Sequence, residues 1–597
     1  MRLRRATVPV AVAAVILAAP AAPATGAPGT ASGSTAVGYG GAVASVDATA
    51  TTVGLDVLRH GGNAVDAAVA TAAALGVTEP FSSGIGGGGF FLYYDARTRT
   101  VHTLDGRETA PASMGVNAFV DPASGQPYPF QEARVSGIST GIPGSLMTWQ
   151  TALRNWGTKS LRAALQPAIT VAERGFPVDA TFNGQVASNA AAFSQFTSTS
   201  ALYLPGGAPP AIGSTFRNPQ LADTYKLIAR DGAGALYGGA IGRDAVATVT
   251  HPPLSSSPAQ SWPYPVAAGG MGIADLSAYA VRQPAPTHVT YHGLDVYGMP
   301  TPSSGGSTVG EALNILKNFD LAGEPRVTAL HDYLDASALA FADRNRYVGD
   351  YTPRATLDSL LTNDFGRQRA CLVDQSHALA TPVAPGQPGA GAGCVAAATT
   401  ATDSTEQHTT NLTVADRWGN VVEYTLTIEQ IGGNAMVVPG RGFLLNNELT
   451  DFNFTPTQGS APDPNLPAPG KRPRSSMAPT ILLHNGHPYL AVGSPGGATI
   501  ITTVLQILVN RLDFGMNLPD AIAAPRVSQR NGATTDVESA FLATPEAAGL
   551  AALGYHFGTP AEIGAATGVE FLGGGRLLAA AEPVRRGGGT AGVVQPG

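Results

Sequence analysis

Segments with helical and extended patterns alternate along almost the whole chain. TTVGLDVLRHGG (residues 51–62) predicts a helix that ends at glycine, and NAVDAAVATAAALGV (63–77) predicts a second helix with Asn63 as its N-cap. FFLYYDA and TVHTLDGRE then predict two strands. Further helices are predicted at 144–176, 308–347 and 499–513, and further strands at 411–428, 478–494 and 567–580. Because no repeat is visible, this order predicts one large α/β (α+β) assembly rather than a string of modules.

The composition is that of a globular protein. The 597 residues are 44% hydrophobic and 13% charged, with a formal net charge of −7. Such a chain can bury a large core, and its mild acidity argues against a nucleic-acid partner, which requires basic clusters. The 73 glycines and 46 prolines are spread without a short period, which indicates long loops.

The N-terminus has the pattern of an export signal. Basic residues within 2–5 precede an apolar stretch at 8–19, and APA at 22–24 resembles a cleavage site. The apolar stretch is shorter than the roughly 20 residues of a membrane-spanning helix, and no later segment is apolar enough to span. We therefore expect a signal peptide at 1–24, a disordered leader at 25–36, and a secreted, extracellular protein.

The chain has two cysteines, Cys371 and Cys394, on either side of a loop rich in Pro, Gly and Ala. In an exported protein we expect them to form a disulfide, which would stabilise the fold by roughly 3 kcal/mol in the chain-entropy model. A reactive thiol or a metal site is disfavoured, because there is neither a CxxC motif nor a nearby His pair; His377 stands alone. We expect no cofactor and no metal.

Two familiar motifs occur in the wrong context. Residues 84–89 (GIGGGG) satisfy GxGxxG, but the order here is helix, glycines, strand, whereas a dinucleotide site needs strand, glycines, helix. A tight turn is the simpler interpretation.

Ser139 lies in GISTG, which matches the GxSxG nucleophile elbow, and HGG at 60–62 resembles an esterase oxyanion loop. A serine esterase is therefore an alternative, although HGG links two predicted helices and Pro143 interferes with a helix directly after Ser139.

A hairpin is predicted directly after a threonine pair, Thr409 and Thr410. Polar and apolar residues alternate over 411–415 and 421–428, and turn residues separate the two runs. If the turn centres on Trp418, Thr409 lies opposite Thr427, and Glu429 follows on the same face. Threonine pairs across strands are common in ordinary sheets, so the hairpin alone does not indicate catalysis.

Three later clusters put polar groups or glycines beside predicted strands. Glu448 and Asp451 suit a substrate ammonium, and Ser475 and Ser476 suit a carboxylate or hydroxyl. Two backbone N–H groups, as in an oxyanion hole, could come from Gly496-Gly497.

Over nearly its whole length the sequence resembles the gamma-glutamyltransferases (gamma-glutamyl transpeptidases, or glutathione hydrolases). Six segments carry the resemblance, in this order: GGNAVDAAVATAAALGVTEPFSSGIGGGGFF, LDGRETAP, HTTNLTVADRWGN, LLNNELTDF, KRPRSSMAPT and GSPGGATIITT. It implies an N-terminal-nucleophile hydrolase with a four-layer αββα sandwich. It also implies self-cleavage between His408 and Thr409, giving a large subunit (37–408) and a small catalytic subunit (409–597) that remain together as a heterodimer.

The resemblance also implies the chemistry. Freed by cleavage, the α-amine of Thr409 takes the proton of its own hydroxyl, and the hydroxyl attacks the γ-carbonyl of glutathione or another gamma-glutamyl compound. Water, an amino acid or a peptide then takes the acyl group. The implied assignments are Thr427 bonded to the nucleophile, Arg107 and Ser475 at the substrate α-carboxylate with Ser476 beside them, Glu448 and Asp451 at the α-ammonium, and Gly496 and Gly497 at the oxyanion.

Two residues depart from the family pattern. Asn411 stands where a His or similar residue is usual, and Glu429 stands where many members have Asn, which adds a third carboxylate near the ammonium. The segment 452–470 is short for a lid, so we expect hydrolysis to exceed transfer. A related acylase of the cephalosporin, glutaryl or capsule-processing type is the alternative function. A non-enzymatic binding protein would need a damaged nucleophile or oxyanion pair, and both are intact.

Overall fold

The computed structural model describes residues 33–389 and 409–597, and the described residues belong to one compact unit. Its strands are β1 (Thr35–Ser45), β2 (Gly88–Asp95), β3 (Thr100–Gly106), β4 (Phe176–Pro177), β5 (Thr215–Phe216), β6 (Thr287–Tyr291), β7 (Leu294–Gly298), β8 (Thr410–Asp416), β9 (Val421–Thr427), β10 (Thr480–His484), β11 (His487–Gly493), β12 (Val527–Ser528), β13 (Asp536–Val537), β14 (Thr567–Gly573), β15 (Arg576–Ala581) and β16 (Thr590–Pro596).

The α-helices are α1 (Ala48–Arg59), α2 (Ala64–Thr78), α3 (Phe130–Arg134), α4 (Ser145–Trp156), α5 (Leu161–Arg174), α6 (Ala180–Phe193), α7 (Thr197–Tyr203), α8 (Pro219–Asp231), α9 (Gly234–Tyr237), α10 (Ala240–Thr250), α11 (Ile273–Ala278), α12 (Gly305–Leu316), α13 (Arg326–Tyr347), α14 (Arg354–Leu360), α15 (Asn363–Ala370), α16 (Thr499–Leu512), α17 (Leu518–Ala523), α18 (Ser539–Leu542) and α19 (Pro545–Ala552). A short 3-10 helix, η2 (Glu448–Asp451), carries two of the predicted site residues.

The main sheet forks at β1 into two stacked layers. The strand order is β3-β2-β9-β8-β1-β15-β14-β11-β10-β7-β6, with β16 also paired to β1. The second half of β1 pairs with β8 and its first half pairs with β15. Strands β8 and β9 contact β11 and β14 without pairing with them, so the two branches lie face to face. At the fork Gly41 has φ +127°, and a Cβ there would lie 3.1 Å from the carbonyl oxygen of Ala415.

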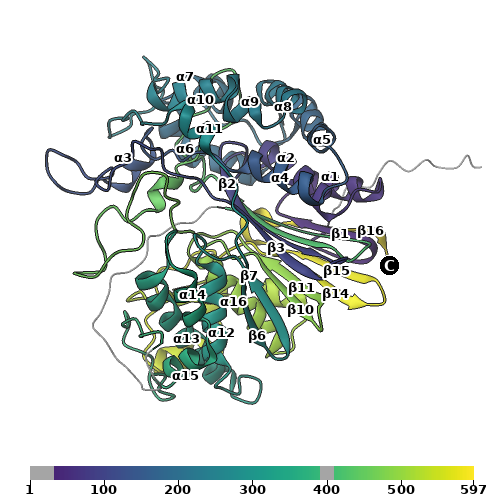
Figure 1. Ribbon diagram of the computed structural model, residues 1–597, viewed down its shortest axis with the longest axis vertical. Coiled ribbons are helices and arrows are strands. Elements are labelled where there is room, and N and C mark those ends of the chain that lie inside the picture. The colour runs from purple at the N-terminus through teal and green to yellow at the C-terminus, as the bar shows by residue number, and fades with distance from the viewer. Residues whose placement is uncertain (1–32, 390–408) are drawn as a thin grey trace, which may run out of the picture. The chain divides into compact units, whose positions relative to one another are not determined.

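Helices cover the outer face of each layer (Figure 1). Alternation along β2 points Phe91 and Tyr93 into a core shared with α1, α2, α4 and α5, and points Phe90, Leu92 and Tyr94 into a second core. This second core lies between the sheets and extends to α12, α13 and α16. The resulting helix–sheet–sheet–helix order is the predicted αββα sandwich.

Most predicted elements are present, and Asn63 caps α2 in a capping box with Asp66. The predicted disordered leader at 25–36 is wrong at its end: residues 33–36 are described, and Thr35 and Ala36 belong to β1, paired with Ala580 and Ala579. The reason is that the partner strand is supplied by the far end of the chain, which no local pattern at 25–36 reveals.

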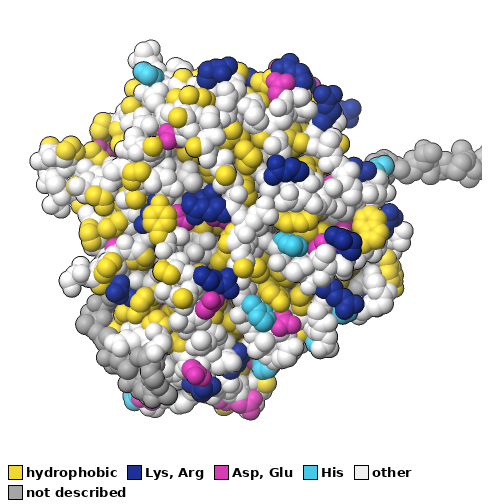
Figure 2. All heavy atoms as spheres, viewed as in Figure 1, with side chains coloured by type: hydrophobic (Ala, Val, Ile, Leu, Met, Phe, Trp, Pro, Cys, Tyr) yellow, Lys and Arg dark blue, Asp and Glu magenta, His cyan; other side chains and the backbone are white. Residues whose placement is uncertain are grey.

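Other predictions about the termini and loops lie outside the described residues. They include the signal peptide at 1–24, His408 and Cys394, so the disulfide of Cys371 stays a prediction. Among the helices at 33–389 and 409–597, none combines the length and apolarity needed to cross a bilayer. On the face shown in Figure 2, basic and acidic side chains are interspersed.

Candidate active site

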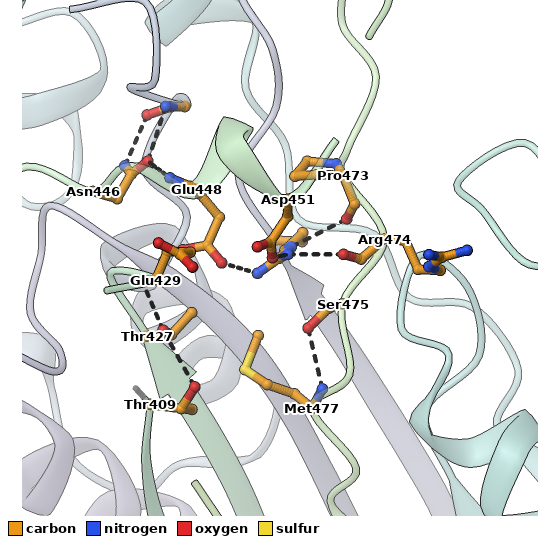
Figure 3. Close-up of polar contacts among 12 residues, drawn as sticks. Thr409, Thr427, Glu429, Asn446, Glu448, Asp451, Pro473, Arg474, Ser475 and Met477 are labelled. Atoms are coloured by element: carbon orange, nitrogen blue, oxygen red, sulfur yellow. Dashed lines mark hydrogen bonds and ion pairs between the residues drawn. The ribbon is translucent and has the colours of Figure 1, made fainter. Parts of the chain in front are cut away.

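The hairpin β8–β9 has the predicted register and brings two threonine hydroxyls together. Asn411 pairs with Thr425, so residue numbers that face each other sum to 836, as expected from a turn centred on Trp418. Thr409 and Thr427 therefore meet at the open end, with their Oγ1 atoms 3.5 Å apart (Figure 3). Thr427 Oγ1 also accepts a 2.8 Å hydrogen bond from the N–H of Glu429.

A small cavity opens beside these hydroxyls. Its lining contains nearly every residue singled out in the sequence: Arg107, Thr409, Thr427, Glu429, Glu448, Asp451, Ser475, Ser476 and Gly497, together with Met477 and Ile500. Gly496 is the neighbour of Gly497 but does not itself line the cavity. The end of β3, the start of β8, the end of β9, η2 and the start of α16 thus converge on one place.

Arg107 is buried and paired with acids on η2. Its guanidinium forms ion pairs with Glu448 and Asp451, and it also donates to the carbonyl oxygens of Pro473 (3.2 Å) and Arg474 (3.1 Å). The groups predicted to hold opposite ends of an amino-acid head group therefore contact each other. A zwitterionic head group can exchange with this ion pair, with its carboxylate on Arg107 and its ammonium on the acids.

Three carboxyl groups lie side by side in Figure 3: Glu429, Glu448 and Asp451. Glu429 has a left-handed backbone (φ +74°), which is a strained conformation for glutamate. Burial, together with the charges of Asp451 and Glu448, raises the pKa of Glu429 well above its usual range. Burial likewise raises the pKa of Glu448, although Arg107 opposes this. Oε1 of Glu429 and Oδ1 of Asp451 accept no hydrogen bond from a described residue.

Hydrogen-bond donors are available at Gly497, which lines the cavity, and at its neighbour Gly496. Gly496 (φ +138°) and Gly497 (φ +57°) precede α16, and neither N–H donates to any residue within the described ranges. Two N–H groups at a helix N-terminus suit an oxyanion. Ser475 Oγ accepts from the N–H of Met477 at 3.2 Å, and Ser476 Oγ accepts from Arg344 at 2.7 Å.

Several buried charged groups around this cavity were not predicted from the sequence. The carboxyl of Glu108 contacts that of Glu448, and burial raises the pKa of Glu108 to about 8. Glu423 lies inside the hairpin, where Asn411 donates to it at 2.5 Å. Arg134 donates to the carbonyl oxygens of Ile431 and Gly433 and so holds the segment after Glu429. A charge in an apolar strand, as at Glu423, is the one local signal that could have revealed any of them.

The two misplaced motifs have structural roles. The hydroxyl of Ser139 donates to the carbonyl oxygens of Arg134 and Ser136, and the side chain is fully buried, so no nucleophile elbow exists there. His60 caps α1, as HGG between two helices implies. In the glycine run, a Cβ on Gly86 would lie 2.0 Å from the carbonyl oxygen of Leu444. The run is a turn that permits close backbone packing, as predicted.

Comparison with known proteins finds one family model and relatives that include glutathione hydrolases and acylases. The sequence model of the gamma-glutamyltranspeptidase family matches residues 50–592. A "Glutathione hydrolase proenzyme" of Bacillus subtilis (strain 168) is 38% identical over 88% of this chain and 87% of its own length. An "Acylase ACY 1 proenzyme" of Pseudomonas sp. (strain V22) is 34% identical, covering 83% of this chain and 84% of the relative. The crystal structure of cephalosporin acylase from Bacillus halodurans superimposes with a TM-score of 0.80 at 27% identity, covering 95% of this chain and 98% of that one.

Proposed function

Because the chain belongs to the gamma-glutamyltranspeptidase family, we propose that it is a secreted glutathione hydrolase in which Thr409 carries the acyl group and water is the preferred acceptor. The observation that carries this proposal is the convergence of the Thr409 hydroxyl, one arginine and three carboxyl groups on one cavity. Such a cavity fits a substrate with an amino-acid head group and a carbonyl several bonds away.

In the proposed mechanism, Thr409 Oγ1 gives its proton to the α-amine freed by self-cleavage and bonds to the γ-carbonyl carbon. The negative charge on the carbonyl oxygen is stabilised by the N–H groups of Gly496 and Gly497. Collapse of this intermediate breaks the amide C–N bond, and the leaving amine takes the proton from the α-amine. Water then attacks the ester, its proton passes to the α-amine, and glutamate leaves as Thr409 regains its hydroxyl.

Hydrolysis is preferred to transfer because nothing from the short segment 452–470 lines the cavity. Phe454 in this segment stacks on Phe119 with ring centroids 4.5 Å apart, and Asp463 accepts hydrogen bonds from Asn453 and Thr457 within it. The segment is therefore fixed against residues 110–138, which supports an open entrance accessible to water.

The function is tested with purified mature protein on amides of γ-glutamate, glutarate and α-glutamate that share one leaving group. We expect the γ-glutamyl amide to be cleaved best, and added glycylglycine to yield less transfer product than free glutamate. Preference for the glutaryl amide would favour the acylase alternative, which the similarity to two acylases makes the second candidate. No cleavage of any amide by self-cleaved protein would refute both.

A further inference from the structure

An arginine from the far end of the chain contacts the proposed nucleophile through its backbone. Nη1 of Arg586 donates a 2.6 Å hydrogen bond to the carbonyl oxygen of Thr409, a residue 177 positions away. Strand β8 begins at Thr410, so the carbonyl of Thr409 lies outside the ladder of the hairpin. The guanidinium therefore supplies a donor that the sheet does not.

The backbone at Arg586 is strained, and its surroundings hold it in place. The residue has φ 57° and ψ 31°, in the left-handed region that non-glycine residues rarely adopt. Its neighbour Arg585 forms buried ion pairs with Glu538 and Glu582, which fix the turn. The N–H of Arg586 donates to Glu562 at 3.2 Å. Strain of this kind persists where the surroundings enforce it, and it concentrates at functional sites.

Arg586 places a guanidinium group in a buried setting, where burial lowers its pKa and the acids Glu79 and Glu562 oppose this. Arginine stays protonated in proteins, and Nη2 of Arg586 is buried with no hydrogen-bond partner among the described residues. Glu79 lies directly after α2, and Glu562 also accepts from the backbone N–H of Arg586. Burial raises the pKa of Glu79 to about 8 although Arg586 opposes this, and the charges of Asp47 and Asp179 raise it further.

We propose that Arg586 is a positioning residue for Thr409, which fixes the nucleophile by its carbonyl oxygen and favours the neutral, proton-accepting form of its α-amine. The inference rests on the proposed function, because only a terminal Thr409 has such an amine. Among the groups that share the cavity with Thr409, the carboxyl groups of Glu429, Glu448 and Asp451 favour the ammonium when they are ionised, and Arg107 opposes it. Arg586 adds a second opposing charge on the same residue, through its contact with the carbonyl oxygen of Thr409.

The test is the pH dependence of kcat/KM for a γ-glutamyl amide, per molecule of self-cleaved enzyme, in wild type and three variants. Arg586→Gln keeps a donor but loses the charge, Arg586→Lys keeps the charge, and Arg586→Met loses both. Removing a positive charge raises the pKa of the amine. In the Gln variant the acidic limb of the kcat/KM profile should therefore move to higher pH by about one unit. In the Lys variant this limb should stay near its wild-type position. The Met variant should show the same shift and a further loss of kcat.

The exposed Arg576→Gln serves as the control and should match the wild type. Equal losses of kcat in the Gln and Lys variants without any shift of the limb would mean that Arg586 is merely structural, and wild-type profiles in both would equally overturn the proposal. If the Met variant does not fold or cleave itself, the Gln and Lys variants still decide. Inactive wild-type enzyme would instead refute the proposed function itself.

Discussion

Glu429 adds a third carboxyl group to Glu448 and Asp451 in the lining of the cavity. Its raised pKa reflects burial and the repulsion of these two neighbours, which a ligand ammonium would relieve. We expect Glu429→Gln to raise KM for γ-glutamyl amides by about tenfold, as for the loss of one charge-assisted hydrogen bond, and to leave self-cleavage intact.

The same variant should lose less activity on glutaryl amides, or gain some, because glutarate has no amine. Initial rates on both amides give the two KM values, and Glu173→Gln, at an exposed glutamate, is the control that should change neither. If KM changed for neither substrate in Glu429→Gln, the carboxyl group would not contact the amine, and the acylase alternative would gain support.

Arg107 should matter for the substrate α-carboxylate. Arg107→Ala leaves Glu448 and Asp451 without their buried partner, which typically costs about 3–5 kcal/mol of stability, so Arg107→Lys is the more informative change. Lysine keeps the charge but cannot make both ion pairs and the two carbonyl contacts at once. We expect Arg107→Lys to fold, and to lose far more kcat/KM on γ-glutamyl amides than on analogues without the α-carboxylate. Equal losses on both would assign Arg107 a structural role.

At the scale of elements, the hairpin β8–β9 contains a buried acid whose titration affects stability. Glu423 is fully buried, and burial raises its pKa well above the usual range although Asn411 and Thr413 oppose this. Below about pH 4.5 the group is protonated in folded and unfolded chains alike. Above that, only the unfolded chain ionises, so stability falls by about 1.4 kcal/mol per pH unit until the folded pKa is reached.

Glu423→Gln should remove this dependence, because glutamine is neutral and still accepts from Asn411. We expect the thermal midpoint of the variant to exceed that of the wild type at pH 8 by several degrees more than at pH 5, in scanning calorimetry at both pH values. The same difference at both pH values would show that Glu423 does not titrate on unfolding.

Elements built from neighbouring residues were predictable, and those that depend on distant partners were not. The hairpin register followed from one turn and the period of two along each strand. No strand was predicted at β1, whose first residues, Thr35 and Ala36, pair with residues at 579–580. The residues lining the cavity were identified through ordered motifs. The contacts of Arg586 with Thr409 and of Glu108 with Glu448 were not, because no sequence pattern links them.

For the whole molecule, the order of strands predicts what happens after cleavage before Thr409. The two predicted fragments alternate in the sheet: β3 and β2 come from the first, β9 and β8 from the second, β1 from the first, β15, β14, β11 and β10 from the second, and β7 and β6 from the first. Separating them would break the strand pairs β2–β9, β1–β8, β1–β15, β1–β16 and β7–β10. It would also expose both cores.

We therefore expect wild-type protein to run as two chains in a denaturing gel and as one particle in native size-exclusion chromatography. The smaller chain should begin at Thr409 and contain 189 residues (597 − 408). Thr409→Ala should elute at the same native volume but remain one chain, because the hydroxyl that attacks the preceding peptide is missing. N-terminal sequencing of the small chain checks the position of the cut. A different first residue would move the nucleophile elsewhere, and native separation of the fragments would mean that the interleaved sheet does not survive cleavage.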